Sequence, residues 1–355
     1  MTGHCDCPPE DASPAHASDT RGVQALREHD DKHVRAERVA SGKVPMMIDA
    51  DIARLLERRN AEPRPGEYPP VADHRAGMHR MAAIFAPEPR IELDSVVDST
   101  IPGPAGDVPV RTYLATNQPT GTVMFFHGGG WMTGDLDSHD FIVRKLVYET
   151  GFGFVAVDYR LAPEHPFPAG LEDCRAAATW VDDRAEDYGG IKGQLAVAGD
   201  GAGGNLAAVV ARKFRDANRH LTAQLLLYPI TDPAGRYPSR YEYGEGYWVT
   251  SDDIAVSAQL YLGNNPTLVT TEDVAPIRAA NLSGLAPAVI GVAHLDPYRD
   301  EGLAYANALA AAGVDVFVSD YQGMIHNFAA MFAISDGANR ALANVLGQFS
   351  KKMTA

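Results

Sequence analysis

From about residue 95 onward, short apolar runs alternate with stretches whose apolar residues recur at helical spacing. The runs Thr122–Phe126 and Gly153–Val157 contain almost no polar residue, which is typical of strands covered on both faces. Strands that alternate with helices predict βαβ units and a parallel sheet. We therefore expect eight strands, the first few antiparallel, at Ser95–Ile101, Val108–Leu114, Thr122–Phe126, Gly153–Val157, Gln194–Ala198, Ala223–Tyr228, Ala288–Ala293 and Asp315–Asp320.

One of these strands leads into a helix through a very short turn. Leu206, Val209 and Phe214 repeat at helical spacing after the strand that ends near Ala198. A helix is therefore expected between Gly203 and Asn218. The predicted fold class is α/β.

Two segments do not follow this alternation, and we expect them to form a helical cap. The first, residues 45–94, has helical stretches at Ile48–Arg59 and His74–Phe85. The second, about residues 232–266, is rich in tyrosine and predicts a helix over Ser251–Leu262 whose N-cap is its first residue.

The charge of the chain excludes two classes of partner. Its 355 residues include 46 Asp and Glu against 31 Lys and Arg, which gives a net charge of −15. So acidic a chain is expected to repel nucleic-acid phosphates and anionic membranes, and neither is an expected partner. Its apolar runs are about ten residues or shorter, below the roughly 20 that span a bilayer.

The N-terminal segment, residues 1–44, is polar and lacks the apolar stretch of a secretory signal, so we expect a tail there. His4, Cys5 and Cys7 could ligate a metal, but they lack a fourth partner and a rigid frame, and no metal site is expected. With Cys174 the chain has three cysteines, too few for a disulfide framework. This usage favours a cytoplasmic location.

Two glycine-rich motifs follow predicted strands. His127–Trp131, with the sequence His-Gly-Gly-Gly-Trp, can expose backbone N–H groups to an oxyanion. Gly199–Gly204, with the sequence Gly-Asp-Gly-Ala-Gly-Gly, lies where a hydrolase carries its nucleophile elbow, G-x-S-x-G. The middle position of this elbow is Gly201, which has no hydroxyl, so an acyl-enzyme cannot form there.

The second motif also contains G-x-G-x-x-G, the spacing of a dinucleotide-binding loop. No acidic residue ends a second strand about 20 positions later, as that reading requires. We therefore expect neither a dinucleotide nor any other cofactor.

An acid and a base lie at later strand ends. Asp296 precedes a proline near the end of one predicted strand, and His326 follows the last strand. Each alone is weak evidence, because loop histidines and Asp-Pro turns are common. Together with position 201, they follow the order nucleophile, acid, base of α/β-hydrolases.

From about residue 90 to its end, the chain resembles the bacterial hormone-sensitive lipase family, or family IV carboxylesterases, of the α/β-hydrolase superfamily. The resemblance rests on motifs in the same order, namely His127–Trp131, Asp158–Ala169, Gly199–Gly204, Tyr228-Pro229, Asp296–Gly302 and Gly323–Phe328. It implies an α/β-hydrolase fold over residues 95–355, an eight-stranded mostly parallel sheet with helices on both faces and a helical cap. The implied activity is hydrolysis of small or medium carboxylic esters.

The resemblance also implies the roles of individual residues. The backbone N–H groups of Gly128, Gly129 and Ala202 would hold the oxyanion. Asp296 would be the triad acid and His326 the base.

Other parts of the chain receive supporting roles from the same resemblance. The segment Asp158–Ala169 would be architectural, and Tyr247 and Trp248 are candidates for the substrate pocket. The expected partner is a small-molecule ester, and a homodimer is the assembly that we consider.

Glycine at position 201 departs from the family, which has serine there. We favour a single deliberate Ser→Gly change in an otherwise competent esterase, because the acid, the base and the oxyanion motifs remain. The alternative is a natural hydrolase-like lyase, cyclase or ligand-binding protein that uses His326 and the oxyanion pocket. Such chemistry needs no nucleophile, since an imidazole can abstract a proton while N–H groups stabilise an enolate.

Overall fold

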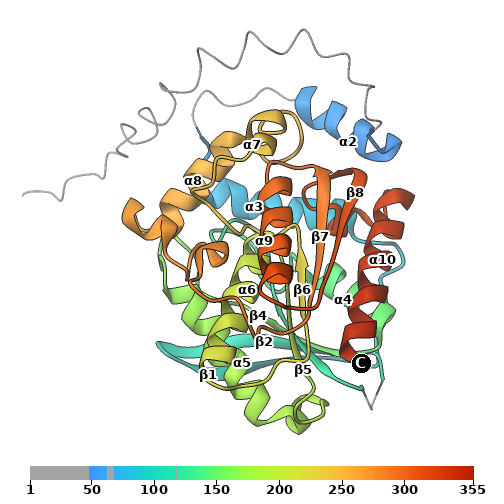
Figure 1. Ribbon diagram of the computed structural model, residues 1–355. Helices are drawn as coiled ribbons and strands as arrows, with labels where there is room; N and C mark the ends of the chain where they lie inside the picture. The colour runs from blue at the N-terminus through green and yellow to red at the C-terminus, as the bar shows by residue number, and fades with distance from the viewer. Residues whose placement is uncertain (1–47, 62–67, 117–118) are drawn as a thin grey trace, which may run out of the picture. The chain divides into compact units, whose positions relative to one another are not determined.

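A computed structural model describes residues 48–61, 68–116 and 119–355 of the protein (Figure 1). The chain divides into two units, Met1–Val44 and Pro45–Ala355. The predicted tail and the residues His4, Cys5 and Cys7 lie outside the described residues. The expected boundaries of the tail, the two cap segments and the hydrolase domain, at residues 45, 95 and about 232–266, stay predictions.

The described residues form an eight-stranded sheet in the order β1-β2-β4-β3-β5-β6-β7-β8. β1 pairs antiparallel with β2, and β2 with β4, while the pairings from β4 through β3 to β8 are parallel. The predicted α/β-hydrolase sheet is thus confirmed. The strands run over Ser95–Gly103 (β1), Gly106–Leu114 (β2), Thr122–Phe126 (β3), Gly153–Val157 (β4), Leu195–Asp200 (β5), Gln224–Leu227 (β6), Ala288–Leu295 (β7) and Val316–Ile325 (β8).

The last two strands are longer than the sequence predicts. The expected strands end at Ala293 and Asp320. In the structure polar groups at these ends pair with each other, His294 Nδ1 lying 2.6 Å from Asp320 Oδ2, so the strands continue to Leu295 and Ile325. The extension matters because Asp296 and His326 follow directly.

Helices cover both faces of the sheet (Figure 1). Side chains of β3 alternate between two apolar cores: Met124 and Phe126 pack into one, and Val123 and Phe125 into the other. The first core includes residues of α5, α6 and α9, and the second includes residues of α4 and α10. The long helices are Ala50–Ala61 (α2), Val71–Phe85 (α3), Asp140–Thr150 (α4), Ala169–Asp183 (α5), Ala202–Asp216 (α6), Ser251–Tyr261 (α8), Arg299–Ala311 (α9) and Asp336–Met353 (α10).

The helices α2, α3, α7 and α8, here called the cap helices, gather at one end of the sheet, at the top of Figure 1. They come from the two segments that fall outside the βα alternation; α7 is short and runs over Pro238–Glu242. The N-cap of α8 is Thr250 rather than Ser251. Thr250 and Asp253 form a capping box, in which each side chain bonds the other residue's backbone N–H, and this fixes the helix start one residue earlier than expected. Short 3-10 helices lie at Ala185–Tyr188 (η1), Pro266–Thr270 (η2), Pro276–Arg278 (η3) and Phe328–Met331 (η4).

Candidate active site

Position 201 lies on a one-residue turn between β5 and α6. Gly201 has φ 52° and ψ −114°, a conformation that strains any residue with a side chain. The turn is anchored, since Gly201 N–H donates to Leu227 O at 2.9 Å and Gly201 O accepts from Asn205 N–H at 3.1 Å. This is the geometry of a nucleophile elbow.

The glycines on either side of the turn are required by close approach of the backbone. A Cβ atom at Gly199 would overlap the carbonyl of Gly203, and a Cβ atom at Gly203 would overlap the carbonyl of Phe126. These glycines therefore let α6 start directly against β5 and β3.

The predicted acid and base are hydrogen-bonded to each other. Asp296, at the end of β7, is fully buried and its Oδ2 lies 2.8 Å from Nδ1 of His326. Asp296 Oδ1 accepts from Tyr298 N–H at 2.8 Å, so both carboxylate oxygens have partners. Because an ionised carboxylate only accepts, Nδ1 carries the proton and Nε2 is left as an acceptor.

The structure brings position 201 and His326 together. A Cβ atom built on Gly201 lies 3.2 Å from His326 Nε2 and 3.6 Å from Cε1, and beyond its own chain neighbours no other atom of the described residues is within 4 Å of it. A hydroxyl at this Cβ would thus come within hydrogen-bond reach of Nε2 after a shift of a few tenths of an ångström. Gly201, Asp296 and His326 have the relative placement of nucleophile, acid and base.

The oxyanion loop requires one correction to the sequence analysis. Gly128 N–H donates to Asp200 Oδ1 at 2.8 Å, so this donor is engaged and does not face a substrate. Within the described part of the chain, no hydrogen bond is formed by the N–H groups of Gly129, Gly130 and Ala202. The sequence motif included Gly130, but it did not reveal which of its three glycine N–H groups would be hydrogen-bonded within the protein.

Comparisons with known proteins agree with this geometry. Residues 123–330, more than half of the chain, match the family described as alpha/beta hydrolase fold. Carboxylic ester hydrolase LipN of Mycobacterium tuberculosis is 42% identical over 259 residues, which cover 71% of this chain and 69% of LipN.

The chain belongs to the hormone-sensitive lipase family of α/β-hydrolases. A solved hyperthermophilic esterase from the archaeon Pyrobaculum calidifontis is 34% identical, with a TM-score of 0.82 over 87% of this chain and 100% of that one. A serine-to-alanine mutant of esterase rPPE, complexed with (S)-Ac-CPA, is 30% identical, with a TM-score of 0.78 over 88% of this chain and 98% of that one. The relatives of the chain are carboxylic ester hydrolases and esterases, so the chain belongs to a family of carboxylic ester hydrolases.

Beneath the oxyanion loop of this hydrolase lies a group that the sequence analysis did not single out. It consists of Asp200, His127 and His139, all buried, and is called the buried group below. His139 Nε2 lies 3.9 Å from Asp200 Oδ1, and the His127 and His139 rings are 5.2 Å apart. Burial lowers the pKa of both imidazoles to about 4 and raises the pKa of Asp200 to about 6.

The segment Asp158–Ala169 contacts the oxyanion loop from below. Tyr159 donates its hydroxyl to His127 O at 2.8 Å and stacks its ring on that of His127 at 4.3 Å. Arg160 is held by Asp173 through its backbone N–H at 3.0 Å and its Nε at 2.8 Å. These contacts support the architectural role that the family resemblance implies.

Two aromatic residues flank the base, and neither was predicted to do so. The ring of Tyr228 lies 4.7 Å from that of His326, and the ring of Tyr298 lies 5.3 Å from it. Tyr228 and Tyr298 belong to the family motifs Tyr228-Pro229 and Asp296–Gly302, and membership of these motifs was the only sequence signal for them.

The predicted pocket residues Tyr247 and Trp248 are not brought to the base by any described contact. Tyr247 packs on Tyr243, with ring centroids 5.2 Å apart. The ring centroids of Trp248 and Phe85 of α3 are 5.8 Å apart, and the Arg59 guanidinium lies over the Trp248 ring, 4.1 Å from its centroid. The Trp248 contacts join the loop between α7 and α8 to α2 and α3, and the Tyr243–Tyr247 contact lies within that loop. A pocket role for Tyr247 and Trp248 stays a prediction.

Two further observations concern the described residues alone. Among them, no group of three or more His, Cys, Asp or Glu side chains has the arrangement of a metal site. None of the helices in the described ranges combines the length and apolar character needed to cross a membrane.

Proposed function

We propose that this chain is a carboxylesterase of small or medium esters whose nucleophile position is vacant, so that it binds esters without forming an acyl-enzyme. The observation that carries the proposal is the open space at Gly201, where a Cβ atom would meet only His326. The hydrogen bond between Asp296 and His326, and the N–H groups of Gly129, Gly130 and Ala202 that bond no described residue, support it.

A serine at this position would complete a triad. Its hydroxyl would attack the ester carbonyl while His326 Nε2 accepts the proton, and Asp296 would hold the ring and stabilise its charge. The N–H groups of Gly129, Gly130 and Ala202 would bind the oxyanion, with roughly 3 kcal/mol or more lost per donor removed. His326 would then give this proton to the oxygen of the departing alcohol, which leaves an acyl-serine. Water, deprotonated by His326, would attack the acyl carbon and release the acid, and the proton would return to the serine oxygen.

A relative supports the binding half of the proposal. The serine-to-alanine mutant of esterase rPPE was obtained in complex with (S)-Ac-CPA, so removal of a serine side chain there is compatible with a bound ligand. By analogy, we infer that Gly201 leaves the ester-binding surfaces of this chain intact.

The test is turnover of p-nitrophenyl acetate and butyrate by the chain and by its Gly201→Ser variant. We expect the variant to exceed the chain by several orders of magnitude, since loss of a triad nucleophile costs on the order of 10⁶ in kcat in a well-measured serine hydrolase. A folded variant that is inert on short and medium acyl chains would overturn the proposal.

A second function is favoured by one observation, the free approach to His326 Nε2 at position 201. A substrate proton could be abstracted there without a nucleophile, which is chemistry of a lyase or cyclase. Elimination or cyclisation by the unchanged chain, lost in His326→Ala, would establish this alternative.

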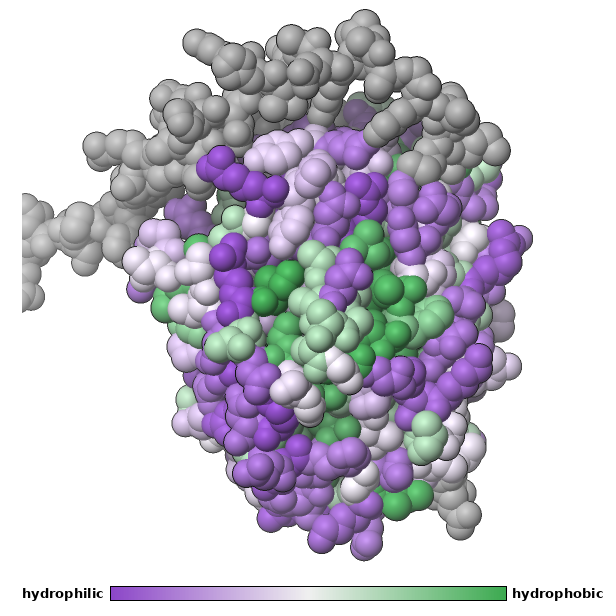
Figure 2. Space-filling view, viewed as in Figure 1, coloured by the Kyte–Doolittle hydropathy of each residue, from purple (hydrophilic) through white to green (hydrophobic). Residues whose placement is uncertain are grey.

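We further propose a homodimer and a cytoplasmic location. Apolar side chains gather in the middle of the face seen in Figure 2, over α9 and the neighbouring strands, and Val318 of the edge strand β8 is exposed. An edge strand beside apolar surface favours self-association. Light scattering on the purified chain measures its mass and so distinguishes a dimer from a monomer.

The cytoplasmic location rests on cysteine usage, and cell fractionation tests it.

A further inference from the structure

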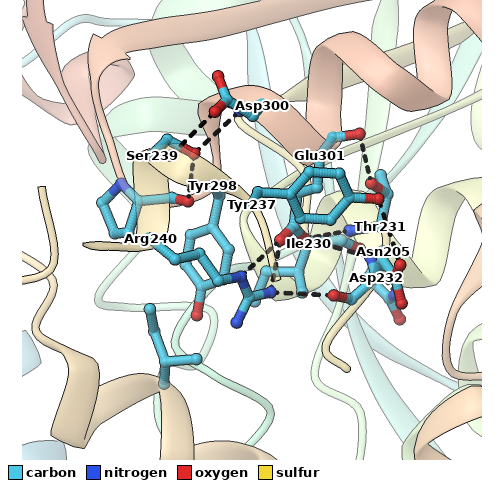
Figure 3. A network of polar contacts seen from close by, with 12 residues as sticks. Asn205, Ile230, Thr231, Asp232, Tyr237, Ser239, Arg240, Tyr298, Asp300 and Glu301 are labelled. Atoms are coloured by element: carbon cyan, nitrogen blue, oxygen red, sulfur yellow. Dashed lines mark hydrogen bonds and ion pairs between the residues drawn. The ribbon is translucent and has the colours of Figure 1, made fainter. Parts of the chain in front are cut away.

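Two polar side chains near the catalytic base have incomplete hydrogen bonds. They belong to Arg240 of α7 and Tyr298, which follows β7, and Figure 3 shows both within a larger polar network. The Arg240 guanidinium lies 5.2 Å from the centre of the Tyr298 ring, and that ring lies 5.3 Å from His326.

Two of the three nitrogen atoms of the Arg240 guanidinium form hydrogen bonds within the protein. Its Nε donates to Glu301 Oε2 at 3.0 Å, and its Nη2 donates to the same oxygen and to Asp232 O at 3.0 Å. Glu301 is completely buried and also accepts from Thr231 N–H at 2.8 Å, which fixes the pair in place. Nη1 has no partner among the described residues, although the side chain is only 11% exposed.

The Tyr298 hydroxyl is likewise without a partner in the described part of the chain, and no dashed line meets it in Figure 3. The hydroxyls of Tyr113, Tyr261 and Tyr305 are unpartnered and sealed from solvent, whereas that of Tyr298 keeps some access to solvent although the residue is only 5% exposed. Burial raises the pKa of Tyr298 well above its ordinary value, so its hydroxyl keeps its proton and can donate.

We propose that Tyr298 and Arg240 bind an oxygen acceptor of the substrate, so that this site prefers esters with a second oxygen in the chain, such as a ketone or ether. The preference rests on the proposed function, because the acceptor is placed by an ester bound at position 201. A carbonyl or ether oxygen has two lone pairs and can accept from both the O–H and the N–H.

The local charges favour a neutral acceptor over a carboxylate. Glu301 already neutralises Arg240, and the negative charge of Asp253 contributes to the raised pKa of Tyr298, so it is felt at the Tyr298 hydroxyl. A substrate carboxylate would therefore meet two like charges beside one compensated cation. A neutral oxygen gains the hydrogen bonds without that repulsion.

Binding to the unchanged chain measures this preference directly, since the chain is expected to hold esters without cleaving them. Calorimetry would compare ethyl hexanoate with ethyl esters in which one acyl methylene, at successive positions, is replaced by an ether oxygen or a ketone. We expect one position to bind about five- to tenfold tighter than ethyl hexanoate, the size of one or two net hydrogen bonds.

Variants assign the preference to these groups. Tyr298→Phe is expected to abolish most of it, measured within the variant as the ratio of the affinities for the oxygen-containing ester and for ethyl hexanoate. Tyr237→Phe is the matched control, since Tyr237 belongs to the same network but gives its hydroxyl to Asp232 Oδ2 at 3.2 Å. Arg240→Lys, which keeps the charge facing Glu301, is expected to reduce the preference as well; if this variant does not fold, Tyr298→Phe decides.

The outcomes separate this inference from the proposed function. If ethyl hexanoate binds but no oxygen-containing ester binds better, or if Tyr298→Phe keeps the preference, the inference is wrong and the proposed function stands. If no ester binds at all, the proposed function fails and the inference fails with it.

Discussion

Two carboxylate–imidazole groups flank position 201, and they are built from the same residue types in opposite ways. In one, Asp296 accepts from His326 at 2.8 Å, and the free Nε2 faces the site where a nucleophile would stand. In the other, Asp200 lies 3.9 Å from the nearer imidazole nitrogen, and its Oδ1 accepts from Gly128 N–H instead.

The surroundings explain this difference. The side chain of His326 is 12% exposed toward the site, whereas His127 and His139 are sealed, and burial lowers their pKa to about 4. A base must keep access to its proton, so only His326 can serve. The buried group can act only by holding the oxyanion loop, and the following variants, made where stated in the Gly201→Ser form, test that division.

The largest effect is expected from His326→Ala in the Gly201→Ser form. Removing the base leaves the new hydroxyl without a proton acceptor, and kcat should fall on the order of 10⁶-fold. Hydrolysis of p-nitrophenyl butyrate measures this, with circular dichroism as the check on folding. A decrease below tenfold in a folded variant would remove His326 from the mechanism.

Asp296→Asn should be the next most damaging change in that form. An amide in place of the carboxylate favours the wrong tautomer of His326, and a loss of about 10⁴-fold in kcat is expected. The matched control is Asp320→Asn, which changes the carboxylate bound to His294 Nδ1. Equal losses in the two variants would contradict the assignment of Asp296.

Asp200 should matter less, and through the loop alone. Asp200→Ala frees Gly128 N–H and loosens the loop that carries Gly129, so kcat should fall about ten- to hundredfold with little change in the pH profile. Asp200→Asn keeps an oxygen that can accept from Gly128 and should retain most activity. If Asn were as damaging as Ala, the charge of Asp200 would have a direct role.

The smallest effect concerns stability against pH. A folded pKa of about 4 for His127 and His139 lies below the ordinary 6.5, so their contribution is full above pH 6.5 and is lost as pH falls toward 4. The raised pKa of Asp200, about 6, acts in the opposite direction. From these three groups, we expect the free energy of unfolding to fall by about 2 kcal/mol between pH 7 and pH 5.

Urea unfolding at the two pH values measures this difference. His139→Asn should shrink it by more than half, and His220→Asn, which changes an exposed histidine, should leave it unchanged. An unaltered pH difference in His139→Asn would show that the buried imidazoles are not its source.

The same comparison shows how far the sequence could lead. The elbow, Asp296 and His326 were predictable, because backbone geometry demands glycines at fixed spacing and each residue follows a strand of the sheet. The engagement of Gly128 by Asp200 was not, since adjacent glycines in one motif look alike until the buried carboxylate is placed. The contacts of Trp248 with Arg59 and Phe85 were equally hidden in the sequence, and its role in the substrate pocket stays a prediction.

The most direct test of the central claim is covalent labelling at position 201. An activated phosphonate ester reacts with a triad serine to leave a stable adduct, which intact-protein and peptide mass spectrometry locate. We predict one adduct on the Gly201→Ser form, at residue 201, with none on the unchanged chain and almost none when His326→Ala is added. Labelling of the unchanged chain, or absence of an adduct at residue 201 in the folded Gly201→Ser form, would contradict the account.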